Sequence, residues 1–277
     1  MIIRDQSRLA DEYRSESEEG AYVLYWMQAA QRLYYNPALE AAALTASFRK
    51  LPLLVVFCVD QSVPEANLRH FSFMLQGLEE LALELESRAI AIHICQGTAL
   101  EVLPYYLRDC LALFCDRGYL NWQKELRLKL KGWCHSLDKS FCEIDTEAVV
   151  PVHLASTKEE YSAASLRSKM LKLMLPYLQS EDAESFLTEL PRFDSQPLAH
   201  PGRPCFIPKK GKYHFLTQDL LPGLKIDRSV PASQYFYGGR KEARRLLKEF
   251  LHRRFEYYAT GRSDPGLCLQ TELSPYL

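Results

Sequence analysis

The chain has 277 residues and a mass of 32.0 kDa, which suits one large domain or two modest ones. Hydrophobic residues make up 47% and charged residues 25%, so the composition excludes a mostly disordered or fibrous protein. The net charge is −1, but residues 203–262 hold 14 Lys or Arg against 5 Asp or Glu. This basic segment favours a polyanionic partner such as nucleic acid, although a solvated helix face would account for the same charges.

Several classes of protein have no support in the sequence. No apolar run approaches the roughly 20 residues of a membrane-spanning helix, and the first 20 residues lack the apolar centre of a secretory signal. The eight cysteines form no C-x-x-C pair, so we expect buried or incidental thiols and no metal site. No catalytic triad or carboxylate pair stands out, and no catalytic residue is assigned. We expect a soluble, cytoplasmic protein without a membrane partner, and a monomer.

Five short apolar segments predict strands that are buried on both faces, because each is nearly continuous in apolar residues. They lie at 22–27, 51–59, 89–95, 111–116 and 141–145. Helical patterns separate them, at 37–50, 65–88, 99–108 and 119–133. This alternation predicts an α/β fold with a doubly wound, five-stranded parallel sheet.

Ligands of such sheets bind outside the carboxyl ends of the strands, where the strand order reverses. We therefore expect the crevice walls to be the loop after Met27, the loop after Val59 and the corner at 116–118. No G-x-G-x-x-G sequence follows the first strand, so the usual dinucleotide fingerprint is absent.

The second half of the chain lacks the alternation of strands and helices. A helix is predicted at 158–179, followed by a Pro-rich connector with a hairpin of 205–207 and 213–215. Gly238 and Gly239 then open a strong amphipathic helix at 240–260. The last apolar stretch has nothing after it to pack against, so the end at Leu277 is interpreted as an interruption.

Ordered matches to a known family run along most of the chain. They include Tyr25-Trp26-Met27, Asn36, Asp116 with Tyr119-Leu120, Val149-Val150-Pro151, Ala155-Ser156, Gly238-Gly239, Tyr258, Asp264-Pro265 and Leu273 to Leu277. In these residues the chain resembles the class II cyclobutane pyrimidine dimer photolyases of the photolyase/cryptochrome family. One departure is Ser263, where that family usually has Asn between Arg and Asp.

The resemblance implies a division of the chain and a function. It implies an N-terminal extension at 1–20, a Rossmann-like antenna domain at 21–179, a connector at 180–237 and the truncated start of a helical FAD domain at 238–277. The parent protein would be a deoxyribodipyrimidine photo-lyase that repairs UV-damaged DNA by electron transfer from light-excited, reduced FAD. A deazaflavin or folate antenna chromophore is a further possible cofactor, and the chain alone is expected to be inactive.

The resemblance also implies which residues contact the flavin. Tyr258 corresponds to a helix tyrosine that contacts FAD, and Thr271, Leu273 and Ser274 correspond to a phosphate-contacting element in which Glu272 offers only its backbone. A purely structural interpretation remains open, with Tyr258 closing a core stripe and Ser274 acting as a helix N-cap.

A second function stays open beside the repair enzyme. The chain could be a non-catalytic module that binds a chromophore or a nucleotide, in the manner of a cryptochrome-like photoreceptor. The open reading frame beyond Leu277 would separate the two hypotheses.

Overall fold

The computed structural model describes residues 1–158, 160–178, 193, 205–207 and 215–276. The chain divides into two compact units. The sheet unit comprises Met1–Asp60 and Glu84–Ile207, and the helical unit comprises Gln61–Leu83 and Pro208–Leu277. Helix α2 (Leu68–Ser87) contributes residues to both.

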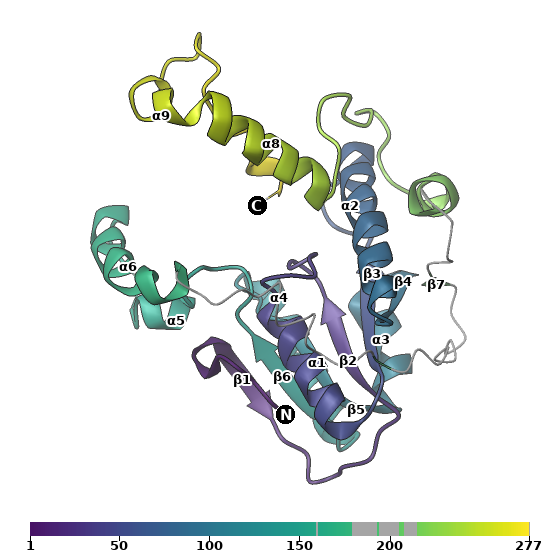
Figure 1. The fold of residues 1–277 in the computed structure, drawn as a ribbon. Helices are drawn as coiled ribbons and strands as arrows, with labels where there is room; N and C mark the ends of the chain where they lie inside the picture. The colour runs from purple at the N-terminus through teal and green to yellow at the C-terminus, as the bar shows by residue number, and fades with distance from the viewer. Residues whose placement is uncertain (159, 179–192, 194–204, 208–214, 277) are drawn as a thin grey trace. The chain divides into compact units, whose positions relative to one another are not determined.

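The sheet unit is built on a seven-stranded sheet with the order β1-β6-β5-β2-β3-β4-β7 (Figure 1). The strands are β1 (Leu9–Tyr13), β2 (Tyr22–Met27), β3 (Leu53–Val59), β4 (Ala91–Gln96), β5 (Cys110–Asp116), β6 (Ser140–Ile144) and β7 (Cys205–Phe206). The central five, β6-β5-β2-β3-β4, are mutually parallel, which confirms the predicted parallel sheet. Every residue of β2 and β5 is buried, as their continuous apolar sequences require.

Two antiparallel edge strands extend the predicted sheet: β1 was not predicted, and β7 was predicted only as one arm of a hairpin, not as a partner of β4. Strand β1 pairs with β6 and strand β7 pairs with β4. All five residues of β1 are only half-buried, and its sequence Leu-Ala-Asp-Glu-Tyr carries two charges, which suits an exposed edge and gives no buried-strand pattern. Strand β7 has only two residues, too few for any periodicity.

Helices cover both faces of the sheet. In the sheet unit they are α1 (Pro37–Arg49), α3 (Ala99–Leu107), α4 (Asn121–Ser136), α5 (Val152–Ala155) and α6 (Ala163–Leu178). Leu24 and Trp26 of β2 share one core cluster with residues of α3 and α4. Tyr25 points to the opposite face, because side chains alternate along a strand, and its hydroxyl meets the cap of α1. The doubly wound arrangement is therefore confirmed.

Helix α6 is shorter than predicted. It begins at Ala163, five residues after the predicted start at Lys158. In the residues before it, Glu160 accepts hydrogen bonds from the Ser156 hydroxyl, at 2.6 Å, and from the Lys169 ammonium. This cluster fixes an irregular segment where the sequence pattern predicts a helical turn.

The helical unit contains α8 (Arg240–Arg253) and α9 (Phe255–Gly261), where one continuous helix was predicted. That prediction is wrong at Arg254, whose backbone φ of −121° leaves the helical region. The Arg254 guanidinium donates to the carbonyl oxygen of Gln270 at 3.0 Å and pairs with Glu272 at 3.3 Å. A contact to residues 16 and 18 positions away thus stabilises the break, and a local pattern cannot reveal it.

Most of the predicted connector, including the turn at 209–212 and residues 213 and 214 of the hairpin, lies outside the described residues. Of the hairpin, residues 205 and 206 form β7, and Phe215 lies in a helical turn.

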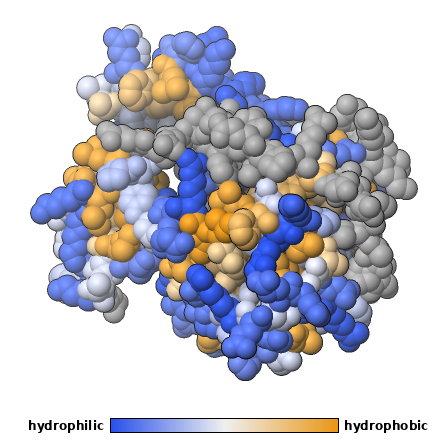
Figure 2. All heavy atoms as spheres, turned by 60° about the horizontal axis from the view of Figure 1, so that its bottom comes forward, coloured by the Kyte–Doolittle hydropathy of each residue, from blue (hydrophilic) through white to orange (hydrophobic). Residues whose placement is uncertain are grey.

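Hydrophobic side chains reach the surface in several places. Figure 2 shows hydrophobic patches among hydrophilic residues on the face that it draws. On α6, the exposed leucines are Leu166, Leu171, Leu173, Leu175 and Leu178. Among the described residues, none of the helices has the length and apolar character needed to cross a membrane.

Candidate functional site

The carboxylate of Asp116 organises the carboxyl edge of the sheet at the point where the strand order reverses, between β2 and β5. Asp116 ends β5 and is completely buried. Its Oδ2 accepts hydrogen bonds from the backbone N–H groups of Gln28, Ala29 and Ala30, at 2.9, 3.1 and 3.2 Å. The hydroxyl of Tyr25 donates to Oδ1 at 2.8 Å. The amides that could hold a ligand phosphate at this edge therefore hold a protein carboxylate instead.

A buried arginine closes the same region from α4. Arg127 donates from Nε to the backbone carbonyl of Asp116 at 2.6 Å, and its guanidinium also donates to the side-chain oxygen of Gln28. The guanidinium lies 5.3 Å from the ring centroid of Trp26, a cation–π contact, and 3.5 Å from the Glu143 carboxylate. The corner at 116–118 and the loop after Met27, both predicted to be crevice walls, are thus joined to each other by contacts within the protein.

The loop after β2 ends in a well-defined helix cap. The Asn36 side chain accepts from the N–H of Leu39 at 3.0 Å and so caps α1. Its amide group donates to the carbonyl oxygens of Ala30 and Arg32, at 3.0 and 3.1 Å. These bonds fix the loop that carries Arg32.

A cavity of about 740 Å³ lies beside this loop, entirely within the sheet unit. It is lined by the N-terminal segment 3–8, the loop residues Arg32 and Tyr35, the start of α1, residues 146–149 after β6, and residues 176–178 at the end of α6. This volume is in the range of small-molecule sites.

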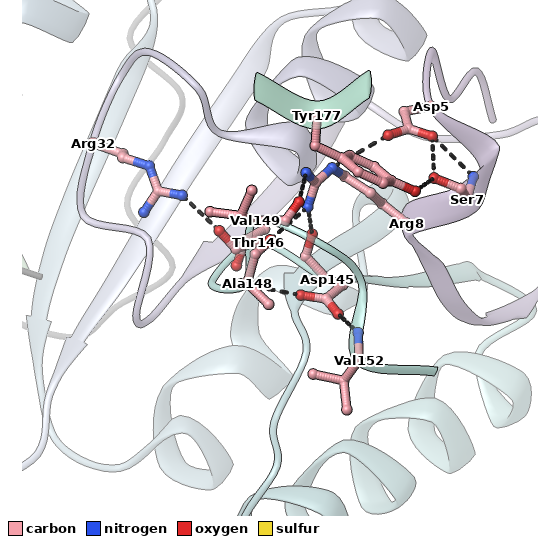
Figure 3. A network of polar contacts seen from close by, with 10 residues as sticks. All are labelled: Asp5, Ser7, Arg8, Arg32, Asp145, Thr146, Ala148, Val149, Val152 and Tyr177. Carbon is pink, nitrogen blue, oxygen red and sulfur yellow. Dashed lines mark hydrogen bonds and ion pairs between the residues drawn. The ribbon is translucent and has the colours of Figure 1, made fainter. Parts of the chain in front are cut away.

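Arg8 holds one wall of the cavity together (Figure 3). Its guanidinium donates to the backbone carbonyl oxygens of Asp145, Ala148 and Val149, at 3.3, 3.0 and 2.8 Å. The ring of Tyr177 from α6 lies over the same guanidinium, at 5.2 Å. The N-terminal segment, the loop after β6 and α6 therefore meet at one side chain.

Two carboxyl groups in the cavity wall have altered acidity. Burial raises the pKa of Glu40 to about 7, although Arg4, Arg8 and Arg32 act in the opposite direction. Burial also raises the pKa of Glu147 above its usual value. Near neutral pH, a fraction of the molecules therefore carries an uncharged Glu40.

Sequence reasoning missed the residues of this cavity. Asp116, which is not a lining residue, was singled out because it lies at the carboxyl end of an apolar strand. Arg8 and Glu40 carry no motif, and Arg8 acts on carbonyl groups about 140 residues further along the chain. For Arg8, the sequence offers no sign of a role in the cavity beyond its positive charge.

The helical unit holds the five residues predicted to contact a flavin. Tyr258 lies on α9, half-buried, with its ring 5.4 Å from that of Phe250 and 5.8 Å from the guanidinium of Arg262. The packing against Phe250 agrees with the structural interpretation of Tyr258, and because the residue is only half-buried the flavin contact stays open.

The segment 271–274 lies against the junction of α8 and α9. Arg254 pairs with Glu272, whose backbone has a left-handed φ of 58°. The Thr271 hydroxyl accepts from the N–H of Leu273 at 3.3 Å, and Ser274 begins a short 3-10 turn, η4 (Ser274–Tyr276). Glu272 therefore contributes its carboxylate to the structure as well as its backbone.

These groups suit the phosphate end of a dinucleotide. The segment offers hydroxyls on Thr271 and Ser274, and hydroxyls can donate to phosphate oxygens, whereas the Arg254 guanidinium is already paired with Glu249 and Glu272. Among the described residues, no three His, Cys, Asp or Glu side chains are grouped so that they could hold a metal ion.

Comparisons with known proteins agree on one family. A family model described as DNA photolyase matches residues 23–185. The chain is 32% identical to the deoxyribodipyrimidine photo-lyase of Methanothermobacter thermautotrophicus over 258 residues, which is 93% of this chain and 53% of that protein. It is 30% identical to that of Potorous tridactylus, over 94% of this chain and 46% of the relative, and 36% identical to that of Arabidopsis thaliana, over 92% and 50%.

A solved structure has the same fold. The archaeal photolyase from Sulfolobus tokodaii, described with two FAD molecules, matches with a TM-score of 0.55 and 17% identity, over 81% of this chain and 45% of that one. The chain spans about half the length of the curated relatives it matches. The family model covers more than half of the chain, and the relatives cover almost all of it, so the chain belongs to the DNA photolyase family.

Proposed function

We propose that this chain is the N-terminal portion of a class II cyclobutane pyrimidine dimer photolyase. One observation carries the proposal: relatives that share 30 to 36% identity over more than nine-tenths of the chain are named deoxyribodipyrimidine photo-lyase. In the complete enzyme, light-excited reduced FAD would pass an electron to a pyrimidine dimer, and the electron would return after the cyclobutane ring opens. The sheet unit would supply the antenna domain.

The assignment to class II rests on particular residues. Val149-Val150-Pro151 lie between β6 and α5, where the side chain of Val150 is buried, and Ala155-Ser156 lie at the end of α5. Gly238 approaches the backbone of α2 so closely that a Cβ atom would lie 1.9 Å from the carbonyl oxygen of Phe73. The close packing against α2 therefore explains why this position of the motif is a glycine.

For the cofactor, we propose that Tyr258 contacts FAD and that Thr271, Glu272, Leu273 and Ser274 lie at its phosphates. The hydroxyls of Thr271 and Ser274 support this. A deazaflavin or folate antenna is proposed for the sheet unit on the resemblance alone. Most of the flavin cage would come from residues outside this chain.

For the partner, we propose UV-damaged DNA, with α8 near the duplex. Arg245 forms ion pairs with Glu242 and Glu249, at 2.7 and 3.1 Å, so part of the basic face is neutralised within the helix. Lys248 and Arg253 are exposed on the same helix and would supply phosphate contacts.

The experiment uses the full-length protein that contains this chain, loaded with FAD and reduced. UV-irradiated oligonucleotide is incubated in blue light and in the dark, and the remaining dimers are counted by chromatography. We expect loss of dimers in the light only. A protein that keeps its flavin and leaves the dimers intact in the light would contradict the proposal and favour the cryptochrome-like module.

A matched pair of variants tests the flavin contact. Tyr258→Ala should lower the amount of FAD retained through purification, because it removes a ring that we place against the cofactor. Tyr257→Ala is the control, since Tyr257 is the neighbouring exposed tyrosine on the same helix. Equal retention of FAD by the two variants would contradict the role of Tyr258.

A further inference from the structure

The cavity beside α1 contains chemistry that the proposed function does not use. Its walls come from the N-terminal segment, the loop after β2, the start of α1, the loop after β6 and the end of α6. No predicted flavin contact lies among its lining residues, all of which belong to the sheet unit.

Arg32 supplies a positive charge to the cavity. Its Nε donates to the carbonyl oxygen of Tyr35 at 3.1 Å, and a terminal nitrogen donates to the carbonyl oxygen of Thr146 at 2.6 Å. Both acceptors are uncharged, so these bonds orient the guanidinium without neutralising it. A guanidinium has five N–H donors in a fixed plane, and the remaining ones can bind a ligand oxyanion.

Thr146 places an unused hydroxyl in the same wall. Its side chain is only 3% exposed and lines the cavity. Its Oγ1 is buried and has no hydrogen-bond partner among the residues that the structure describes. A buried hydroxyl without a partner costs about 1–3 kcal/mol, and a rotation of the Thr146 side chain that brings its hydroxyl to a ligand oxygen in the cavity would remove that cost.

The cavity also has aromatic and apolar walls. Tyr35 from the loop after β2 is 52% exposed, and Tyr177 from α6 lies over Arg8. Val149 and Pro176 line the space between. A ring carried by the ligand would therefore find side chains to pack against.

The charge balance near neutral pH admits an anion. Glu40, on α1, has a pKa of about 7 because it is buried. Arg4 and Arg8 from the N-terminal segment and Arg32 from the loop after β2 act on it electrostatically. The same cavity is lined by two further carboxyl groups, Asp5 and Glu147. When Glu40 is protonated, a negative charge is removed and a donor is gained.

From this geometry we propose that the cavity binds a small aromatic phosphate monoester, whose phosphate contacts Arg32 and Thr146 and whose ring packs against Tyr35 and Tyr177. This inference goes beyond the proposed function and does not depend on it. It can be tested in the dark and without flavin.

The test is titration calorimetry of the purified chain with phenyl phosphate, and with phenol and inorganic phosphate as partial ligands. We expect one site per chain with a Kd below about 1 mM for phenyl phosphate, and at least roughly tenfold weaker binding of either partial ligand. Phenol or inorganic phosphate binding as tightly as phenyl phosphate would overturn the proposal, and so would the absence of saturable binding.

Variants locate the site. Thr146→Val should weaken phenyl phosphate binding about tenfold, while the melting temperature stays equal or rises, because the change removes only an unpaired hydroxyl. Arg32→Gln should weaken it at least as much. Thr260→Val and Arg108→Gln, at exposed positions outside the cavity, are the controls and should bind normally.

Two further measurements complete the test. Glu40→Gln should bind phenyl phosphate about fivefold more tightly than the parent chain at pH 8, since it removes a nearby negative charge, and equally at pH 5.5. A short DNA duplex should not displace the probe. Unchanged binding by Thr146→Val, or displacement by the duplex, would contradict a small-molecule site.

Discussion

A single carboxylate, Asp116, replaces a bound anion at the carboxyl edge of the sheet. In many doubly wound folds, glycine-rich backbone at this place holds the phosphate of a dinucleotide. Here three backbone amides of the loop after β2 donate to Asp116 Oδ2. The absence of the glycine motif and the presence of a buried carboxylate therefore agree: the loop amides bind Asp116 instead of a ligand phosphate.

Asp116→Asn should therefore destabilise the sheet unit. An amide has one oxygen, and its NH2 group would face N–H donors, so about 2–4 kcal/mol of unfolding free energy should be lost. Urea denaturation followed by circular dichroism measures this loss. Asp109→Asn, at an exposed position, is the control and should change little. Equal midpoints for the two variants would contradict the role of Asp116.

Glu40 should make the stability of the protein depend on pH. Its pKa is raised from 4.5 to about 7 in the folded protein, so the folded state binds this proton more tightly than the unfolded state does. The resulting stabilisation is complete below pH 4.5 and is lost as the pH rises through 7. Relative to Glu40→Gln, the parent chain should lose roughly 2 kcal/mol between pH 5 and pH 8, after allowance for partial exposure.

The measurement is the unfolding free energy of both proteins at the two pH values. Glu16→Gln serves as the control, because Glu16 is exposed. If Glu40→Gln and the parent chain show the same pH dependence, Glu40 titrates normally and the cavity wall is more open to solvent than the structure indicates.

At the scale of elements, apolar runs predicted all five parallel strands to within two residues at each end, because a strand buried on both faces has a strong compositional signal. The edge strand β1 lacks that signal, and β7 was predicted only as one arm of a hairpin. The break at Arg254 and the late start of α6 depend on contacts between residues that are distant in sequence or follow no period. The cavity could not be predicted for the same reason, because residues from five segments, most of them distant in sequence, form its walls.

The need for glycine just before α8, at Gly238, can be tested by comparison with Gly132, a glycine within α4. A Cβ at Gly238 would lie 1.9 Å from the carbonyl oxygen of Phe73, so Gly238→Ala must displace the backbone and should cost at least about 2 kcal/mol. Gly132 has no atom within 4 Å of such a Cβ and lies inside α4, so Gly132→Ala should add roughly 0.5–1 kcal/mol. Thermal unfolding of both variants gives the comparison, and a stable Gly238→Ala would contradict the close approach.

For the whole molecule, the fold and the family rest on agreement between independent features. The family model over residues 23–185 and the relatives over more than nine-tenths of the chain show the family, and the parallel core strands agree with its fold. The sequence alone could indicate the predicted flavin contacts only through the resemblance, since hydroxyls and one tyrosine have no spacing that specifies a cofactor.

The most direct test of the account is an action spectrum of dimer repair by the full-length, FAD-loaded protein. We predict that the repair rate follows the absorption of the bound flavin and antenna across the near-ultraviolet and blue, and falls to zero in red light and in the dark. Repair that proceeds equally in the dark, or no repair at any wavelength by protein that retains its flavin, would contradict the account.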